Sequence, residues 1–107
     1  MHYTGAISIL CLFLLAKLNS VKIIRFYRDT CPYCVRSKGE WLKFKWYNAW
    51  NPFITAISVD TDTEIGKKTM RQYGLKSVPT IIKMKGLVLS KYDGDRSWRD
   101  ITSFAYN

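Results

Sequence analysis

VKIIRFYRDTCPYC, residues 21–34, carries a β-branched and aromatic run directly before two closely spaced cysteines. The run itself, residues 21–27, is typical of a buried strand, and the polar residues after it are typical of a turn. Pro32 suits the first turn of a helix, and Asp29 or Thr30 is a suitable N-cap. We therefore predict a strand, a turn and then a helix that begins beside the first cysteine.

This helix is expected to run to about residue 46, and the segment after it predicts a second strand. The helix face expected to pack consists of Trp41, Leu42, Lys45 and Trp46. The run PFITAISVD, residues 52–60, is largely apolar on both faces, as in a strand that helices cover on each side. A strand, a helix and a strand in this order favour parallel pairing of the two strands.

The next segment predicts a short helix and a hairpin. Thr61 and Glu64 have the spacing of a capping box, and Gly74 is a suitable stop for the amphipathic helix between them. The side of that helix expected to be buried consists of Ile65, Thr69 and Tyr73. Residues 79–92, PTIIKMKGLVLSKY, divide at the central Lys-Gly into two strands too close for a crossover, so we expect an antiparallel hairpin.

A last helix completes the predicted domain. Ser97 and Asp100 have capping-box spacing, and the apolar residues that follow recur on one helical side. Those residues are Trp98, Ile101 and Ala105. The element order βαβαββα predicts one α/β domain over residues 21–107, with a mixed four-stranded sheet and helices on both of its faces.

The first twenty residues form a separate apolar segment. Residues 6–16 are apolar apart from Ser8, which matches the core of a secretory signal and falls short of the roughly 20 residues of a membrane span. The leader MHYT has no Lys or Arg, and AKLNS is a poor cleavage pattern. Three readings stay open: a signal peptide, a membrane anchor through residues 5–18, or a buried first element. The first two predict the secretory pathway, the endoplasmic reticulum lumen or a membrane; the third predicts the cytoplasm.

The composition favours some classes of binding partner but does not identify a particular partner. The chain has 107 residues and 48% hydrophobic residues, enough for one core. Its 17 Lys and Arg against 8 Asp and Glu give a net charge of +9, which favours anionic partners. The segment EWLKFKWYNAW, residues 40–50, mixes aromatic and basic residues as nucleic-acid binders do. At helical spacing these aromatics are expected in the core, which argues against nucleic acid.

Three cysteines exclude a framework of paired disulfides and leave one pair of interest. Cys11 lies in the apolar run and is interpreted as a small hydrophobic residue. Cys31 is expected at a helix N-terminus, where free N–H groups and the helix dipole favour a thiolate. Cys34 follows one turn later, within disulfide reach and more buried. We therefore predict Cys31 as the catalytic nucleophile and Cys34 as the catalytic resolving thiol.

Two other interpretations of the cysteine pair fit the sequence less well. A zinc site needs two further ligands, and only Cys11 and His2 remain, both in the apolar leader, so no metal is predicted. A chance pair of structural thiols is possible because isolated C-x-x-C motifs are common. The pair borders a strand-helix-strand pattern, however, and this context is typical of redox motifs.

The motif and its context resemble the thioredoxin superfamily over about residues 21–104. A second matching string is RQYGLKSVPTII, residues 71–82, and a third is KYDGDRSW, which contains Tyr92, Gly94 and Arg96. The resemblance implies a thioredoxin fold and a cis peptide bond before Pro79, close to the cysteines. It also implies a set of substrate-binding residues, namely Pro32, Tyr33, Val78 and Pro79.

The central dipeptide and two departures bear on the reaction. CPYC looks like a dithiol glutaredoxin, which would imply glutathione as co-substrate. In thioredoxins a tryptophan usually stands at the position of Thr30 and a buried acid at that of Arg25. An arginine cannot act as a base, but it can stabilise a thiolate and make the pair more oxidising.

The resemblance implies a thiol-disulfide oxidoreductase acting on protein thiols and disulfides, most similar to one protein disulfide isomerase domain. The redox equivalents would reside in the two sulfurs, so no metal or organic cofactor is expected. The alternatives are a glutathione-dependent glutaredoxin and a noncatalytic thioredoxin-like binding module.

Overall fold

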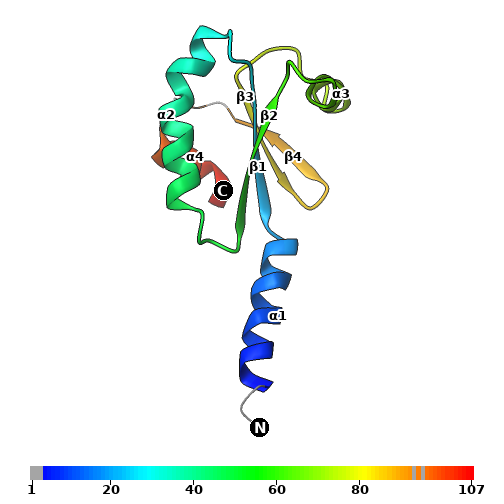
Figure 1. The fold of residues 1–107 in the computed structure, drawn as a ribbon, viewed down its shortest axis with the longest axis vertical. Coiled ribbons are helices and arrows are strands. Elements are labelled where there is room, and N and C mark those ends of the chain that lie inside the picture. The colour runs from blue at the N-terminus through cyan, green and yellow to red at the C-terminus, as the bar shows by residue number, and fades with distance from the viewer. Residues whose placement is uncertain (1–3, 93, 95) are drawn as a thin grey trace.

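The computed structural model describes residues 4–92, 94 and 96–107 as one sheet with four helices (Figure 1). In chain order the elements are α1 (Thr4–Leu18), β1 (Val21–Tyr27), α2 (Pro32–Tyr47), β2 (Ile54–Asp60), α3 (Glu64–Gln72), β3 (Thr80–Lys85), β4 (Val88–Lys91) and α4 (Trp98–Tyr106). From β1 onward this is the predicted order βαβαββα. The thioredoxin fold expected from the sequence is confirmed.

The sheet has the strand order β2-β1-β3-β4 and is mixed. β1 pairs in parallel with β2, with Val21 opposite Ile54, and antiparallel with β3, with Lys22 opposite Met84. β3 and β4 form the predicted antiparallel hairpin, whose turn contains Gly86 at a φ of 62°. β1 is a central strand. Its first residues therefore lie near the middle of one end of the sheet, and its last residues lie near the middle of the opposite end.

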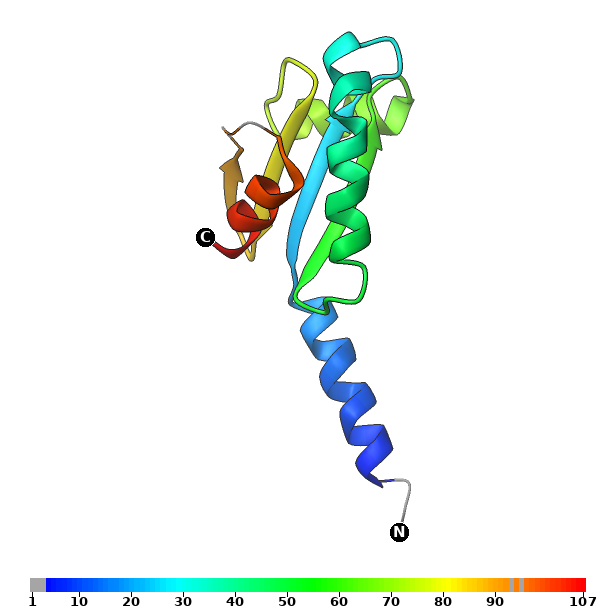
Figure 2. The same cartoon turned by 90° about the vertical axis from the view of Figure 1, so that its left-hand side faces the viewer.

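Helices cover both faces of the sheet (Figures 1 and 2). α2 and α4 lie on one face and bury one core with residues of three strands, while α3 lies on the other face. The buried residues of the first core are Ile23, Trp41, Phe44, Ile54, Ile81, Ile101 and Ala105. Those of the second are Ile24, Phe26 and Ile82. Successive residues of β1 therefore face opposite cores, as strand geometry requires.

Two predicted helix starts are wrong by a few residues. The N-cap of α2 is Cys31, not Asp29 or Thr30, because its own sulfur accepts a hydrogen bond from the N–H of Cys34. The N-cap of α3 is Thr63, not Thr61, and its hydroxyl accepts from the N–H of Gly66. Ser97 caps α4 as predicted, since its hydroxyl accepts from the N–H of Asp100.

The predicted packing of α2 and β2 also needs correction. The buried side chains of α2 are Cys34, Trp41 and Phe44, whereas Leu42 and Trp46 are exposed. β2 is an edge strand with one buried residue, Ile54, and it lacks the complete covering expected from its apolar sequence. A hydrophobic run shows that a segment is apolar, but its place in the sheet decides how much of it is covered.

α1 extends from the end of the sheet where β1 begins (Figures 1 and 2). Residues 9–15 are exposed although almost all of them are apolar. No helix in the described part of the chain combines the length and the apolar character needed to cross a membrane. The side chains of residues 4–8, 17 and 18 lie outside the description.

Candidate active site

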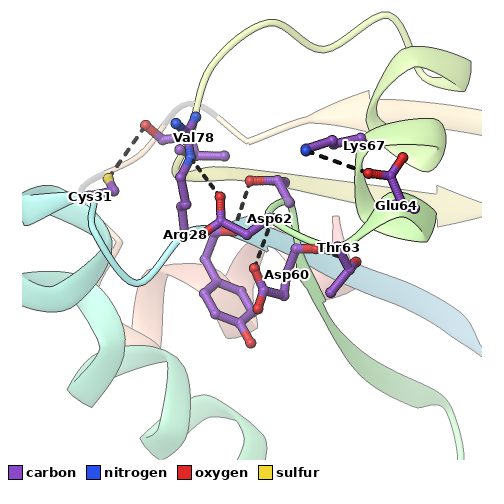
Figure 3. A network of polar contacts seen from close by, with 10 residues as sticks. Arg28, Cys31, Asp60, Asp62, Thr63, Glu64, Lys67 and Val78 are labelled. Atoms are coloured by element: carbon purple, nitrogen blue, oxygen red, sulfur yellow. Dashed lines mark hydrogen bonds and ion pairs between the residues drawn. The ribbon is translucent and has the colours of Figure 1, made fainter.

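The two cysteines lie where the chain leaves β1 and enters α2. Cys31 is the last residue before the helix, and its sulfur is 3.2 Å from the backbone nitrogen of Cys34, which donates to it. The sulfur also lies 3.8 Å from the carbonyl oxygen of Val78, on the loop before β3 (Figure 3). Both cysteines are free thiols. The helix N-terminus thus directs its free N–H groups at the Cys31 sulfur, as the position of the motif suggested.

The environment of Cys31 favours its thiolate. Burial by itself raises the pKa of Cys31, but hydrogen bonds from the Cys34 thiol and from the backbone N–H groups of Cys34 and Tyr33 outweigh it. The positive charge of Arg28 acts in the same direction as these bonds. As a result, the pKa of Cys31 lies below the ordinary value of a thiol. The sulfur is partly exposed, so an approaching disulfide can reach it.

Cys34 has the opposite properties. Its side chain is only 2% exposed, and burial raises its pKa, as do its hydrogen bond to Cys31 and the negative charge of that sulfur. The charge of Arg25 and a hydrogen bond with the backbone of Arg28 offset only part of this increase. The two thiols therefore differ: Cys31 is partly exposed and its pKa is lowered, whereas Cys34 is buried and its pKa is raised.

Arg25 lies beneath the cysteine pair, where thioredoxins usually have an acid. The side chain is 3% exposed, and its Nη2 donates to the carbonyl oxygen of Cys34 at 2.7 Å and to the hydroxyl of Ser37 at 3.3 Å. Desolvation lowers the pKa of Arg25, and the nearby cysteines and Tyr27 partly restore it. The guanidinium borders a cavity of about 360 Å³ that Lys38 also lines. The chain thus places a buried cation behind the resolving thiol.

Arg28 is held in front of the pair by an acidic residue of the next strand-helix connection. Its Nε lies 3.9 Å from the carboxylate of Asp62, and Figure 3 shows the side chain between that carboxylate and Val78. Asp60 accepts from the N–H of Asp62 at 2.9 Å and so shapes the loop that carries this carboxylate. Both partners of the ion pair are about half exposed, so the pair is weak and sensitive to salt.

The loop before β3 brings Pro79 to the site. The Val78-Pro79 peptide bond is cis, as the resemblance implied, and Pro79 is buried. Arg96 donates from Nη2 to the carbonyl oxygen of Pro79 at 3.4 Å, and its backbone N–H donates to the hydroxyl of Tyr92. Tyr92 in turn donates to Asp100. Residues of the string KYDGDRSW therefore support Pro79 in the string RQYGLKSVPTII. Residues 93 and 95 lie outside the described residues.

Pro32 and Tyr33 form the exposed rim of the site. The Tyr33 ring is 63% exposed, and the guanidinium of Arg36 lies 4.3 Å from its centroid. This stacking covers one face of the ring and leaves a flat aromatic surface beside Cys31. The position suits contact with an extended substrate chain.

The structure brings together all six residues that the sequence singled out, namely Cys31, Cys34, Pro32, Tyr33, Val78 and Pro79. Sequence reasoning missed the contact of Arg96 with Pro79 and the bond of Arg25 with the Cys34 carbonyl, because both join residues far apart in the chain. Cys11 lies on α1 and is exposed. Within residues 4–92, 94 and 96–107, no cluster of three His, Cys, Asp or Glu side chains is arranged to hold a metal ion.

Comparison with known proteins agrees with this site. A sequence model of the thioredoxin family matches residues 14–107, and the chain therefore belongs to the thioredoxin family. It is 33% identical over 84 residues to protein disulfide-isomerase erp38 of Neurospora crassa. This match covers 77% of the chain but 23% of the relative, so the chain spans about a quarter of the relative's length.

Solved structures show the same fold. Thioredoxin-2, described as a component of malaria parasite protein secretion machinery, superimposes with a TM-score of 0.69 at 26% identity, over 80% of this chain and 81% of that one. The first thioredoxin domain of mouse protein disulfide-isomerase A4 gives a TM-score of 0.70 at 20% identity, over 81% and 61% of the two chains. At this lower identity the likeness concerns the fold alone.

Proposed function

We propose that the protein is a thiol-disulfide oxidoreductase that exchanges disulfides with protein substrates, with Cys31 as nucleophile and Cys34 as resolving thiol. One observation carries the proposal: the partly exposed Cys31 lies at the N-terminus of α2, where its sulfur accepts from the N–H of Cys34, whereas Cys34 itself is buried. This arrangement lowers the pKa of Cys31 and raises that of Cys34. A structural pair of thiols has no need of this asymmetry.

In the reducing direction, the Cys31 thiolate attacks one sulfur of a substrate disulfide. The substrate bond breaks, a mixed disulfide forms, and the second substrate sulfur leaves as a thiolate that takes up a proton. Cys34 then loses its proton and attacks the Cys31 sulfur, which releases the first substrate thiol. The protein ends with a Cys31–Cys34 disulfide and has given two electrons to the substrate. The reverse sequence oxidises a substrate dithiol.

Protein substrates are favoured over glutathione by the relatives, which are thioredoxin and disulfide isomerase domains. The exposed Tyr33 ring and the Val78 carbonyl beside Cys31 give an extended chain both apolar and polar contacts. Arg25, which stabilises negative charge near Cys34, makes the dithiol form more stable and the disulfide more oxidising. We therefore propose an isomerase or oxidase type of activity.

Two assays on the full chain test this proposal. Refolding of a scrambled disulfide-bonded protein is expected to be accelerated, and turnover of a glutathione mixed disulfide with glutathione as sole reductant is expected to be weak. The CPYC dipeptide supports the glutaredoxin alternative, and the opposite pair of results would establish it. A Cys31 that reacts with iodoacetamide no faster than a model thiol at neutral pH would instead indicate a noncatalytic binding module.

The subcellular localisation is proposed from the relatives and from the apolar N-terminal segment. One relative is a protein disulfide isomerase and another is described as part of a secretion machinery. We place this chain in the secretory pathway, associated with a membrane through residues 5–18. Fractionation of cells that express the chain with and without residues 1–20 tests this, and equal recovery of both forms in the soluble fraction would contradict it.

A further inference from the structure

We propose that the end of the domain opposite the cysteines is a docking surface for an anionic lipid bilayer, placed at the base of α1. This surface, here called the root surface, consists of Trp46, Trp50, Phe53, Leu87, Val88, Lys22 and Lys85. The proposal does not depend on the redox site, but it rests on the membrane association proposed above for residues 5–18. It assigns a role to exposed aromatic residues that the fold does not use.

The root surface is assembled from three segments that meet where α1 joins the sheet. α1 ends at Leu18, and three residues later the N–H of Val21 donates to the carbonyl oxygen of Phe53 at 2.9 Å. The hairpin turn lies on the other side, because Lys22 pairs with Met84, and a hollow of about 210 Å³ joins Ser20 to Gly86. Both views show α1 leaving from this end (Figures 1 and 2).

The aromatic residues are exposed to an unusual extent. Trp46 is 80% exposed and Trp50 is 74% exposed, and Phe53 follows on the same loop at 62%. Leu87 in the hairpin turn is fully exposed. These residues come from the last turn of α2, the loop before β2 and the hairpin turn, at the end of the sheet where α1 joins β1 (Figure 1). Several exposed apolar residues at one end of a domain mark a contact surface, whereas single ones need no explanation.

The loop that carries Trp50 and Phe53 is held in place by buried amide side chains. Asn48 donates from Nδ2 to the carbonyl oxygen of Phe44 at 2.9 Å, and Asn51 accepts from the N–H of Phe53 at 2.9 Å. Both asparagines are buried, at 8% and 4% exposure. The two aromatic side chains are therefore directed outward by an ordered loop, and the outward position is a property of the fold.

The charges at this end favour an anionic partner. Lys22 and Lys85 are exposed, and among the described residues neither is paired with a carboxylate. The described acidic side chains lie elsewhere: Asp29, Asp60, Asp62 and Glu64 at the cysteine end, and Glu40 and Asp100 on α2 and α4. Basic residues beside an apolar surface are attracted to anionic lipids.

A bilayer is favoured over another protein or a nucleic acid because of α1. Its exposed side chains include Ile9, Leu12 and Phe13, which leave no polar stripe. Fifteen residues span about 22 Å as a helix, which is shorter than the roughly 30 Å of bilayer hydrocarbon. Tryptophan is enriched at the membrane interface, where the base of an inserted helix would place this surface. Two contacts also hold a protein more stably than one.

The arrangement would orient the active site. β1 runs from the root surface to the cysteine end over seven residues, or roughly 23 Å. If the root surface contacts the bilayer, Cys31 therefore lies at the end of the domain that is farthest from the lipid. Substrate chains can then reach the sulfur without contacting lipid.

Tryptophan fluorescence tests the proposal directly, because α1 contains no tryptophan and all four lie in the domain. The full chain is mixed with phosphatidylcholine vesicles that contain phosphatidylserine and a lipid brominated near its headgroup. Quenching is expected, and the Trp46→Phe and Trp50→Phe double variant should lose most of it. The matched control is Trp98→Phe, since Trp98 is stacked on Tyr47 and is not part of the root surface. This variant should keep the quenching.

Vesicle flotation gives a second measurement. We expect Trp46→Ser with Trp50→Ser to weaken binding by about tenfold, which corresponds to about 1.4 kcal/mol. Ile65→Ser, at an equally exposed position on α3, should not change it. Omitting phosphatidylserine should weaken wild-type binding, and Lys22→Glu with Lys85→Glu should remove this dependence on lipid charge.

Three results would overturn the proposal. The first is a chain that floats with vesicles while its tryptophans stay unquenched, because α1 would then bind alone. The second is a dimer that dissociates when Trp50 becomes Ser, with no quenching by lipid, which would make the surface a contact between two copies. The third is binding of a single-stranded oligonucleotide through the same residues in the absence of vesicle binding.

Discussion

The two ends of the sheet carry similar residues in different arrangements. At the cysteine end the cations are placed among acids, as in the pairs Arg28–Asp62 and Lys67–Glu64 (Figure 3). At the root surface the lysines have no such acidic neighbours, and the aromatic side chains are exposed instead of packed. The charges at the cysteine end partly compensate one another, whereas unpaired charges beside apolar groups attract a partner of opposite charge. This difference agrees with the proposed redox reaction at one end and the proposed lipid contact at the other.

The largest expected effect comes from removing the nucleophile. Cys31→Ser should reduce disulfide exchange by about a thousandfold or more, to the background rate, because serine cannot form the mixed disulfide. Measurement is by reduction or refolding of a disulfide-bonded protein. Cys11→Ser, on α1, is the control and should retain full activity. Activity of Cys31→Ser above background would contradict the assignment of the nucleophile.

A smaller effect is expected at the cation behind Cys34. Arg25→Met removes a charge that lowers the pKa of Cys34, so this pKa should rise further and less thiolate should form. Because one pKa unit changes the thiolate fraction tenfold, we expect mixed disulfides to resolve up to about tenfold more slowly at neutral pH. The lifetime of the trapped mixed disulfide, measured by acid quenching and mass spectrometry, reports this step.

The controls for Arg25 separate charge from packing. Arg25→Lys keeps the charge and should restore most of the rate, while Lys38→Met removes a more exposed cation that lines the same cavity. A purely structural role of Arg25 would slow resolution equally at every pH. The proposed role predicts that the deficit disappears once the pH exceeds the raised pKa of Cys34.

The pH dependence of alkylation should separate the two thiols. The pKa of Cys31 is lowered, so its reaction with iodoacetamide should persist below pH values at which an ordinary thiol, with a pKa of about 8.5, has become protonated. Its rate should fall only as the pH decreases through the lowered pKa. Cys34, whose pKa is raised, should react only at higher pH.

Arg28→Gln should move the Cys31 midpoint to higher pH by less than about one unit, because the lost charge is half exposed. Added salt should shrink the shift. Lys91→Gln, an exposed lysine on β4, serves as the control and should leave the midpoint unchanged. An identical midpoint in Arg28→Gln at low salt would exclude the arginine as a source of thiolate stabilisation.

The smallest effect is expected when the root surface is mutated and disulfide exchange is measured, or when the cysteine end is mutated and vesicle binding is measured. Trp46→Ser with Trp50→Ser should alter disulfide exchange with a soluble substrate by less than about twofold, since distant sites contribute independently. Cys31→Ser should likewise leave vesicle binding unchanged. A large cross effect in either direction would mean that the two ends are coupled and do not act independently.

The segment of residues 40–50 shows where sequence reasoning fails, because α2 ends within it at Tyr47. Its aromatic residues were all expected in the core, yet Trp41 and Phe44 are buried while Trp46, Tyr47 and Trp50 are exposed. Periodicity showed that a helix forms, but too many large residues were present for one face, and the sheet could cover only some of them. The apolar sequence of β2 is only partly buried for a different reason, which is its place at the edge of the sheet.

The sequence alone determined the order of the elements, the hairpin at residues 79–92 and the cysteine pair, because periodicity, turn residues and a short motif are local properties. The resemblance to a known family, and not a local pattern, placed Pro79 beside that pair. The tertiary structure decided what depends on distant neighbours. It placed Arg25 behind Cys34, joined Arg96 to Pro79 and gathered the exposed aromatics at the base of α1. The lowered pKa of Cys31 comes from residues 28–34 and is therefore local, whereas the burial that raises the pKa of Cys34 and the exposure of the apolar residues depend on how the helices pack on the sheet.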